Sequence, residues 1–147
     1  TGSKDNHGAN VEYIKGNSRL SSLIVSGTRV TDKGMIMIAE SFPRMRFLWA
    51  SNTGVSDKSM PALAKLQALA YLQLDSTGIT DEAMPYIGGL GSMVQLSISS
   101  TKVTDAGLEH LKGLTVLNYL DISHTKVSPD GLAGIKKAFP NCNIYKR

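Results

Sequence analysis

Thr101-Lys-Val-Thr-Asp-Ala-Gly-Leu108 is the fullest copy of a phrase that recurs along this chain. Five copies are present, and their leading threonines are 25, 24, 24 and 24 residues apart. A fixed period of this size is typical of a solenoid, in which each unit buries its apolar face only against its neighbours. The sequence therefore predicts an array of stacked units. The leading threonines are Thr28, Thr53, Thr77, Thr101 and Thr125.

The apolar residues before each threonine predict a short strand. They lie eight, five and three positions ahead of it, in the pattern L-x-x-L-x-L, and the last two alternate with polar residues. Such alternation is typical of a strand with one buried face. In the fourth copy these positions are Met93, Leu96 and Ile98.

The residues after each phrase predict a short helix. Apolar side chains lie seven and ten positions beyond the threonine, and another follows three or four later, which makes one apolar stripe on a helix. Pro61 and Pro85 lie too far into two of these segments for a regular helix, so we expect a 3₁₀ turn first and the helix from near the proline. The second Ser or Thr of each phrase is a suitable N-cap. These residues are Thr31, Ser56, Thr80, Thr104 and Ser128.

The composition is that of a folded globular protein. Of the 147 residues, 41% are hydrophobic and 19% are charged. No run of about 18 apolar residues is present, so we expect no membrane span. The single cysteine, Cys142, excludes an internal disulfide and a zinc site made of several cysteines. It falls at the first apolar position of a last strand, where we expect a buried structural thiol.

The T-x-V-T-D-x-G-L form and the L-x-x-L-x-L strand pattern resemble a leucine-rich repeat. They are similar to the bacterial repeats of about 24 residues, especially planctomycete-like ones. They are also similar to the cysteine-containing repeats of F-box proteins, which carry Cys or Asn where this chain has Thr. The resemblance implies an α/β leucine-rich-repeat solenoid, with a parallel sheet on the concave face and short helices on the convex face.

The two ends are expected to differ from the central repeats. We expect a tail or an expression scar over residues 1–9 and an N-terminal capping half-repeat over residues 10–19. Residues 20–147 are predicted to form the repeat domain, with five repeats and a partial C-terminal strand. Because the chain begins at Thr1 rather than Met, we expect a processed form or an excised fragment. The last strand would leave a sheet edge that needs a cover or could pair with a partner.

The outward side chains of the strands are predicted to form the concave face. In the first three repeats they include an aliphatic residue and three aromatic residues, where a solvated strand face would carry Thr, Lys, Glu and Ser. Exposed aromatic patches are places where partners dock, and the neighbouring amide and carboxylate side chains would orient a ligand. The candidate ligand-binding residues are Ile24, Phe47, Trp49, Tyr71, Gln73, Asp75 and Gln95.

We therefore interpret the chain as a non-catalytic binding or scaffold module whose concave face binds a protein or peptide. A glycan is the alternative ligand, no cofactor is expected, and an extracytoplasmic location is slightly favoured over a cytoplasmic one. A second interpretation is a structural capping fragment of a larger multidomain protein. In that case a neighbouring domain, or an N-terminal flap that contains Tyr13, would cover the aromatic patch.

A hydrolase is the third interpretation. Asp121 and His124 bring an acid and a base to one face, beside rows of serines. A flat sheet, however, supplies neither an oxyanion hole nor a pocket that excludes water. Metal binding is not expected, because Asp75 stands alone in a column of serines and calcium needs several convergent oxygens. Nucleic acid is not expected either, because the strand face lacks a basic stripe between its aromatic residues.

Overall fold

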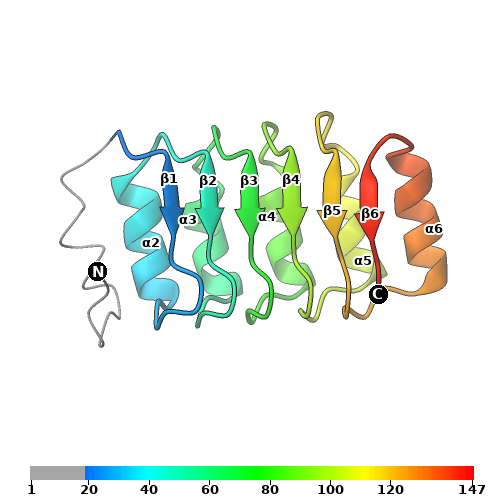
Figure 1. Ribbon diagram of the computed structural model, residues 1–147, viewed down its shortest axis with the longest axis horizontal. Helices are drawn as coiled ribbons and strands as arrows, with labels where there is room; N and C mark the ends of the chain where they lie inside the picture. The colour runs from blue at the N-terminus through cyan, green and yellow to red at the C-terminus, as the bar shows by residue number, and fades with distance from the viewer. Residues whose placement is uncertain (1–18) are drawn as a thin grey trace.

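Six short strands form one parallel sheet, and the helices cover one side of it (Figure 1). The structure, a computed structural model, describes residues 19–147, so the predicted tail and nearly all of the predicted capping half-repeat lie outside the described residues. Strand order follows chain order, and each repeat therefore lies between its neighbours in sequence. The strands are β1 (Ser22–Ile24), β2 (Phe47–Trp49), β3 (Tyr71–Gln73), β4 (Gln95–Ser97), β5 (Tyr119–Asp121) and β6 (Asn143–Tyr145).

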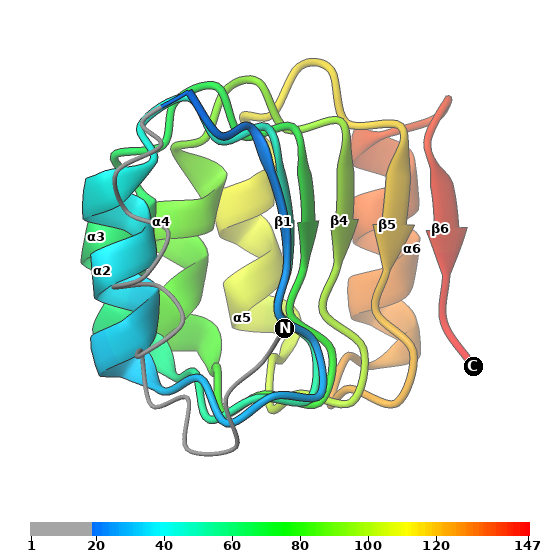
Figure 2. The same ribbon diagram turned by 60° about the vertical axis from the view of Figure 1, so that its left-hand side comes forward.

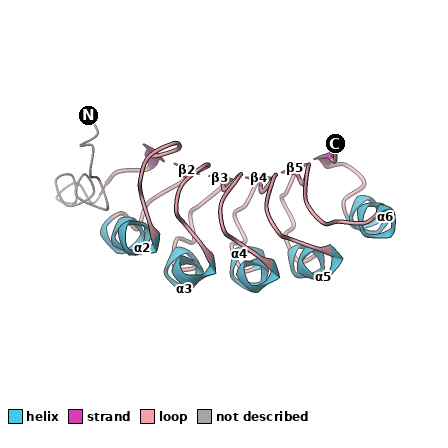
Figure 3. Ribbon diagram, turned by 90° about the horizontal axis from the view of Figure 1, so that it is seen from below, coloured by secondary structure: helices cyan, strands magenta, loops and turns pink. Residues whose placement is uncertain are grey.

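The helices line the outer side of a shallow arc, and the strands line its inner side (Figure 3). Figure 2 shows the same two layers from the side, with β6 at one edge of the sheet. Within residues 19–147, the first and last helices, α2 and α6, have ten residues each, whereas the three central repeats combine a shorter α-helix with a 3₁₀ turn. The helical elements are α2 (Asp32–Ser41), η1 (Asp57–Ser59), α3 (Met60–Leu63), η2 (Asp81–Ala83), α4 (Met84–Gly88), α5 (Asp105–Leu108), η3 (Glu109–Leu111) and α6 (Pro129–Ala138).

The expected effect of the two prolines on the helices is confirmed. Pro61 and Pro85 lie in the first turn of α3 and α4, and each of these helices is preceded by a 3₁₀ turn. Proline lacks the N–H that a residue deeper in the helix would need for its hydrogen bond. The regular helix therefore begins only where that N–H is not required.

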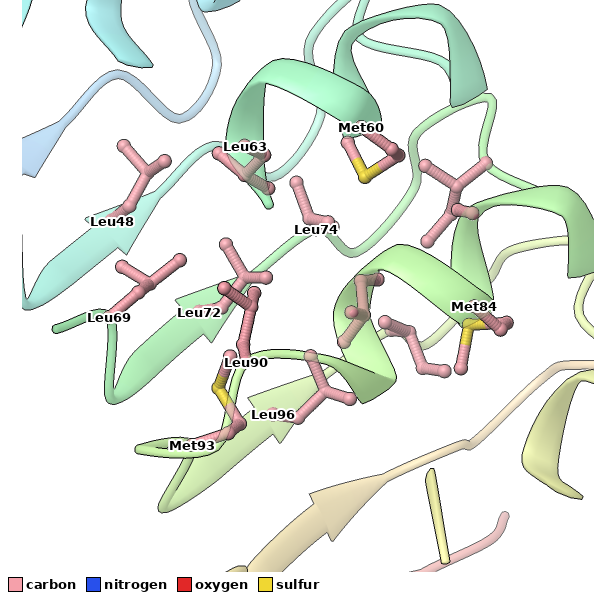
Figure 4. Packing of buried hydrophobic residues seen from close by; sticks show 14 of the residues in the cluster. Leu48, Met60, Leu63, Leu69, Leu72, Leu74, Met84, Leu90, Met93 and Leu96 are labelled. Atoms are coloured by element: carbon pink, nitrogen blue, oxygen red, sulfur yellow. The ribbon is translucent and has the colours of Figure 1, made fainter. Parts of the chain in front are cut away.

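A ladder of leucines forms the centre of the core. Leu48, Leu72 and Leu96 are paired in register on successive strands, and each is at most 1% exposed. Met60 and Met84 belong to the same buried cluster and come from the helical side, as Figure 4 shows. Full burial of each such side chain contributes about 1.5–3 kcal/mol. The apolar interior thus fixes the register of the strands, and with it the rows of side chains on the concave face.

Each leading threonine closes the turn that follows its strand. The Thr101 hydroxyl donates a hydrogen bond of 2.7 Å to the carbonyl of Ile98, and the other four threonines make the same bond at 2.5–2.7 Å. The residue just before each threonine has a left-handed backbone, with φ between 54° and 74°. These turn residues are Gly27, Asn52, Ser76, Ser100 and His124.

The aspartate of each of the first four phrases binds the next repeat. The Asp81 carboxylate accepts hydrogen bonds from the backbone N–H of Thr104 at 2.7 Å and from its hydroxyl at 2.5 Å. The Thr104 oxygen in turn accepts a bond from the N–H of Ala106 and so caps α5. One carboxylate therefore joins two repeats and sets the start of a helix. The equivalent pairs are Asp32 with Ser56, Asp57 with Thr80, and Asp105 with Ser128.

Thr31 is the exception among the five predicted N-caps. It occupies the N-cap position of α2 in an extended conformation, as predicted, but its side chain accepts no capping hydrogen bond. Within residues 19–147, no aspartate of an earlier repeat holds its hydroxyl. In the other four repeats the hydroxyl donates a hydrogen bond to that carboxylate, and its oxygen accepts a bond from a helix N–H group.

Cys142 is half-buried, which corrects the prediction of a buried thiol. Its side chain packs against the end of the core, but it precedes β6, the last strand of the sheet, and so receives cover from only one neighbouring repeat. Partial burial still raises the pKa of the Cys142 thiol. The apolar period correctly indicates the inward position, but the degree of burial also depends on how many repeats pack around it.

Gly107 provides a test of the contact between repeats. A Cβ at this position would overlap the Asp81 carboxylate and would lie 2.9 Å from Cγ of Met84. We predict that Gly107→Ala lowers the free energy of unfolding by about 1–3 kcal/mol, although alanine favours a helix by about 1 kcal/mol over glycine. Urea denaturation measures this. Gly113→Ala is the control, because a Cβ there meets no atom within 4 Å, and equal stability of the two variants would contradict the prediction.

The link between Asp105 and Ser128 of the next repeat is expected to depend on pH. Hydrogen bonds from the Ser128 hydroxyl and then from its backbone N–H hold the pKa of Asp105 below its ordinary value of 3.8. As the pH falls, Asp105 is therefore protonated in the unfolded chain before it is protonated in the folded chain. The stability that its ionised carboxylate contributes is complete above about pH 4 and is lost as the pH falls through the pKa of Asp105 in the folded chain. We predict that Asp105→Asn makes this acid-induced loss of stability shallower in urea denaturation. The exposed Asp130→Asn is the control, and equal slopes for both variants would argue against the link.

Candidate functional site

A groove of about 490 Å³ crosses the concave face over β2 to β5. Six of the seven predicted ligand-binding residues line it, and the seventh, Ile24, lies outside it. Ile24 is 62% exposed on β1 and is paired in register with Trp49. The six lining residues are Phe47, Trp49, Tyr71, Gln73, Asp75 and Gln95.

The register of the sheet places the groove residues in two rows, as the repeat period predicts. The first residues of successive strands form one row and the third residues form the other, at a spacing of about 4.8 Å between strands. Tyr119, Ser97 and Asp121 extend these rows into the groove, and they were not among the predicted ligand-binding residues. The repeat period places these three residues in the same two rows. The contiguous aromatic patch from which we predicted the binding residues, however, lies in the first three repeats. The rows are Phe47–Tyr71–Gln95–Tyr119 and Trp49–Gln73–Ser97–Asp121.

One end of the groove is an aromatic platform. The rings of Phe47 and Tyr71 are stacked, with centroids 4.3 Å apart and planes within 2° of parallel. The guanidinium carbon of Arg46 lies 5.8 Å from the Phe47 centroid. Trp49 stands in the adjacent row and keeps 37% of its surface exposed. Stacked rings lose little further freedom when a ligand covers them, so this platform is ready for apolar contact.

At the other end of the groove, the lining residue Tyr119 is paired with Tyr145 of β6, which does not line the groove. Tyr119 and Tyr145 have ring centroids 5.2 Å apart, with planes tilted by 41°. Burial raises the pKa of Tyr119, and the negative charges of Asp121 and Asp75, together with Tyr145, raise it further. The Tyr119 hydroxyl is therefore held in its protonated form, in which it can donate a hydrogen bond into the groove.

Two carboxylates lie between these ends, and both are fixed by hydrogen bonds. Oδ1 of Asp75 accepts bonds from the Ser97 hydroxyl at 2.5 Å and from the Ser99 N–H at 2.8 Å. Oδ1 of Asp121 accepts a bond of 2.9 Å from the Ser123 N–H. Asp75 thus has a structural role in the turn as well as a place in the groove. The sequence alone did not indicate these bonds, because they join residues of different repeats or the two ends of one turn.

His124 and Asp121 come from the same repeat, but only Asp121 lines the groove. His124 occupies the left-handed turn with φ of 56°, and its backbone N–H donates to the carbonyl of Arg147. Among the hydrogen bonds of residues 19–147, none joins its side chain to Asp121 or to a serine hydroxyl. The described residues therefore do not assemble the nucleophile and base that the hydrolase interpretation requires.

Three other features bear on what the site can do. In residues 19–147, no three His, Cys, Asp or Glu side chains gather closely enough to hold a metal ion. None of the helices in that part of the chain has the length and apolarity needed to cross a bilayer. The N-terminal flap with Tyr13, considered as a cover for the aromatic patch, lies outside the described residues.

Comparisons with known proteins agree with this architecture. Residues 16–39 and 113–136 match the family model described as Leucine Rich repeat, while no curated protein sequence matches the chain significantly. The structure is similar to that of internalin C2 from Listeria monocytogenes, with a TM-score of 0.75, 20% identity, and coverage of 94% of this chain and 56% of the internalin. It is also similar to a leucine-rich-repeat protein of Leptospira interrogans, with a TM-score of 0.61, 17% identity, and coverage of 89% and 38%.

This chain thus spans about half or less of the length of these two bacterial proteins. At these identities the likeness concerns the fold alone. Together with the matched repeats and the six-stranded parallel sheet, it identifies the fold of this chain as a leucine-rich-repeat solenoid.

Proposed function

We propose that this chain is a non-catalytic binding module whose concave groove receives a segment of another protein. The observation that carries the proposal is the groove itself, in which an aromatic platform adjoins polar groups that the fold already holds in place. Solenoids offer their concave surface to partners, because the stacking of repeats uses only the interior and the flanking faces.

The size and chemistry of the groove favour a short segment. A volume of about 490 Å³ accommodates a few side chains rather than a whole domain. Tryptophan and tyrosine dominate binding energies at protein interfaces, since they bury a large area with few rotatable bonds. Trp49 and Tyr71 would therefore be the anchors, and Gln73, Gln95 and Asp75 would orient the backbone or polar side chains of the segment.

The other interpretations stand as alternatives to this proposal. A glycan could use the same combination of aromatic and amide groups. A structural interface with another domain of a larger protein would place the same residues under a permanent cover. A nearer kinship to planctomycete-like or F-box repeats, and an extracytoplasmic location, remain predictions from the sequence.

Selection of peptides from a random display library tests the proposal. We predict that the wild-type chain enriches peptides whose binding falls at least about tenfold in Trp49→Ala and Tyr71→Ala, the scale expected for anchor residues. Tyr86→Ala is the matched control, because Tyr86 is 41% exposed on α4 of the helical face and does not line the groove.

Two results would count against the proposal. Peptides that bind Trp49→Ala as well as the wild type, or that are lost equally in Tyr86→Ala, would place binding outside the groove. If the wild type enriches no peptide and Trp49→Ala unfolds at much lower urea concentration, the aromatic patch has the structural role instead.

A further inference from the structure

We infer that the groove selects a basic side chain, lysine or arginine, on the partner segment. This inference rests on the proposed function of the groove and specifies the chemistry of its ligand. It comes from the charges, hydrogen bonds and aromatic rings that lie between β3 and β5.

The charge of the groove is opposite to that of the whole chain. Asp75 and Asp121 line the groove, and no lysine or arginine is among its lining residues. The chain nevertheless carries a net charge of +4. Clefts lined by one sign of charge concentrate ligands of the other sign. A polycation would be repelled by the chain in general and attracted at this groove in particular.

The two carboxylates flank a single residue, Ser97. Asp75 accepts the hydrogen bond of the Ser97 hydroxyl at 2.5 Å, and Asp121 is the register partner of Ser97 on the next strand. Adjacent strands are about 4.8 Å apart, so both carboxylates lie within reach of one ligand group seated above Ser97. Backbone N–H groups orient one oxygen of each carboxylate. The second oxygen of Asp75 accepts only a long hydrogen bond of 3.5 Å from the Ser51 hydroxyl, and a carboxylate oxygen can accept a further bond from a ligand.

The aromatic rings on either side suit a cation as well. The Phe47 ring already has the Arg46 guanidinium carbon 5.8 Å from its centroid, and the Tyr145 ring has that of Arg147 at 5.9 Å. These contacts show that rings at both ends of the face accept guanidinium groups at cation–π distance. Burial is the main cause that raises the pKa of Tyr119, and the carboxylates of Asp121 and Asp75 raise it further, whereas Arg147 lowers it.

An organic cation fits these groups better than a metal ion does. Calcium takes six to eight oxygen ligands, and two carboxylates that already accept hydrogen bonds supply too few. A guanidinium or ammonium group needs only one or two carboxylates, and its alkyl stem would lie against the aromatic platform. The hydrogen-bonded oxygens would keep their present partners.

Titration of the full chain with two matched peptides tests the inference. The probes are acetyl-(Gly-Arg)₃-amide and the same peptide with citrulline, which keeps the shape of arginine without its charge. Trp49 is the only tryptophan and lines the groove, so its fluorescence reports binding. We expect the citrulline peptide to bind at least about tenfold more weakly, as the loss of charge-assisted hydrogen bonds requires. We also expect the affinity for the arginine peptide to fall as salt is added.

Two charge-matched double variants locate the effect. Asp75→Asn with Asp121→Asn keeps an oxygen for the Ser99 and Ser123 N–H groups, and we expect it to weaken binding of the arginine peptide at least about tenfold. Glu40→Gln with Asp130→Asn removes the same charge from the helical face, and we expect binding to stay unchanged. Circular dichroism melting confirms that each double variant is folded.

Each contrary result overturns the inference in a recognisable way. Equal binding of the two peptides, equal binding by the groove variant, or equal loss in the control variant would show that basic side chains are not selected. If neither peptide changes the fluorescence but display-selected peptides still require Trp49, the inference fails and the proposed function stands. A fluorescence change with maltohexaose alone would assign the groove to a glycan and overturn both.

Discussion

In the described array, an aspartate carboxylate of one repeat accepts hydrogen bonds from the residue that caps the helix of the next repeat. Asp81 illustrates this link: its two oxygens bind the N–H and hydroxyl of Thr104, and the same hydroxyl oxygen caps α5. One side chain therefore joins two repeats and sets the start of a helix. Gly107 is small because this carboxylate occupies the space where a side chain would begin. The contact between repeats thus explains why Thr, Asp and Gly recur at these positions of the phrase.

Because the residues that stabilise the fold lie in the interior, the turns and the helix starts, most of the concave face is available for binding. The inward leucines hold the register, the threonines close the turns, and the aspartates of the phrase join the helices. Most outward residues have none of these tasks, so they can differ from one repeat to the next, although Asp75 also binds Ser97 and Ser99 of the next repeat. In β2 to β5 they combine stacked aromatic rings with carboxylates that backbone N–H groups hold in place. A ligand would meet groups that are already ordered, which lowers the entropic cost of binding.

The sequence predicted the fold well, because a period of 24 residues fixes which side chains become neighbours. The register of Phe47 with Tyr71, and the 3₁₀ turn before Pro85, both followed from that period and from proline chemistry. The burial of Cys142 did not, since burial at an end depends on how many neighbours a repeat has. The period also placed Asp121 in the same row as Trp49, but it did not predict that Asp121 lines the groove. The lining of the groove depends on the shape of the assembled sheet, which a column of residue types does not reveal.

The central claim for function is that the aromatic platform is open to a partner, and acrylamide quenching of Trp49 fluorescence tests it most directly. N-acetyltryptophanamide and the urea-unfolded chain supply the fully exposed references. With 37% of its surface exposed, Trp49 should emit at a red-shifted wavelength and should be readily quenched in the folded chain. A blue-shifted emission that acrylamide hardly quenches would show that the platform is already covered, and would contradict the account.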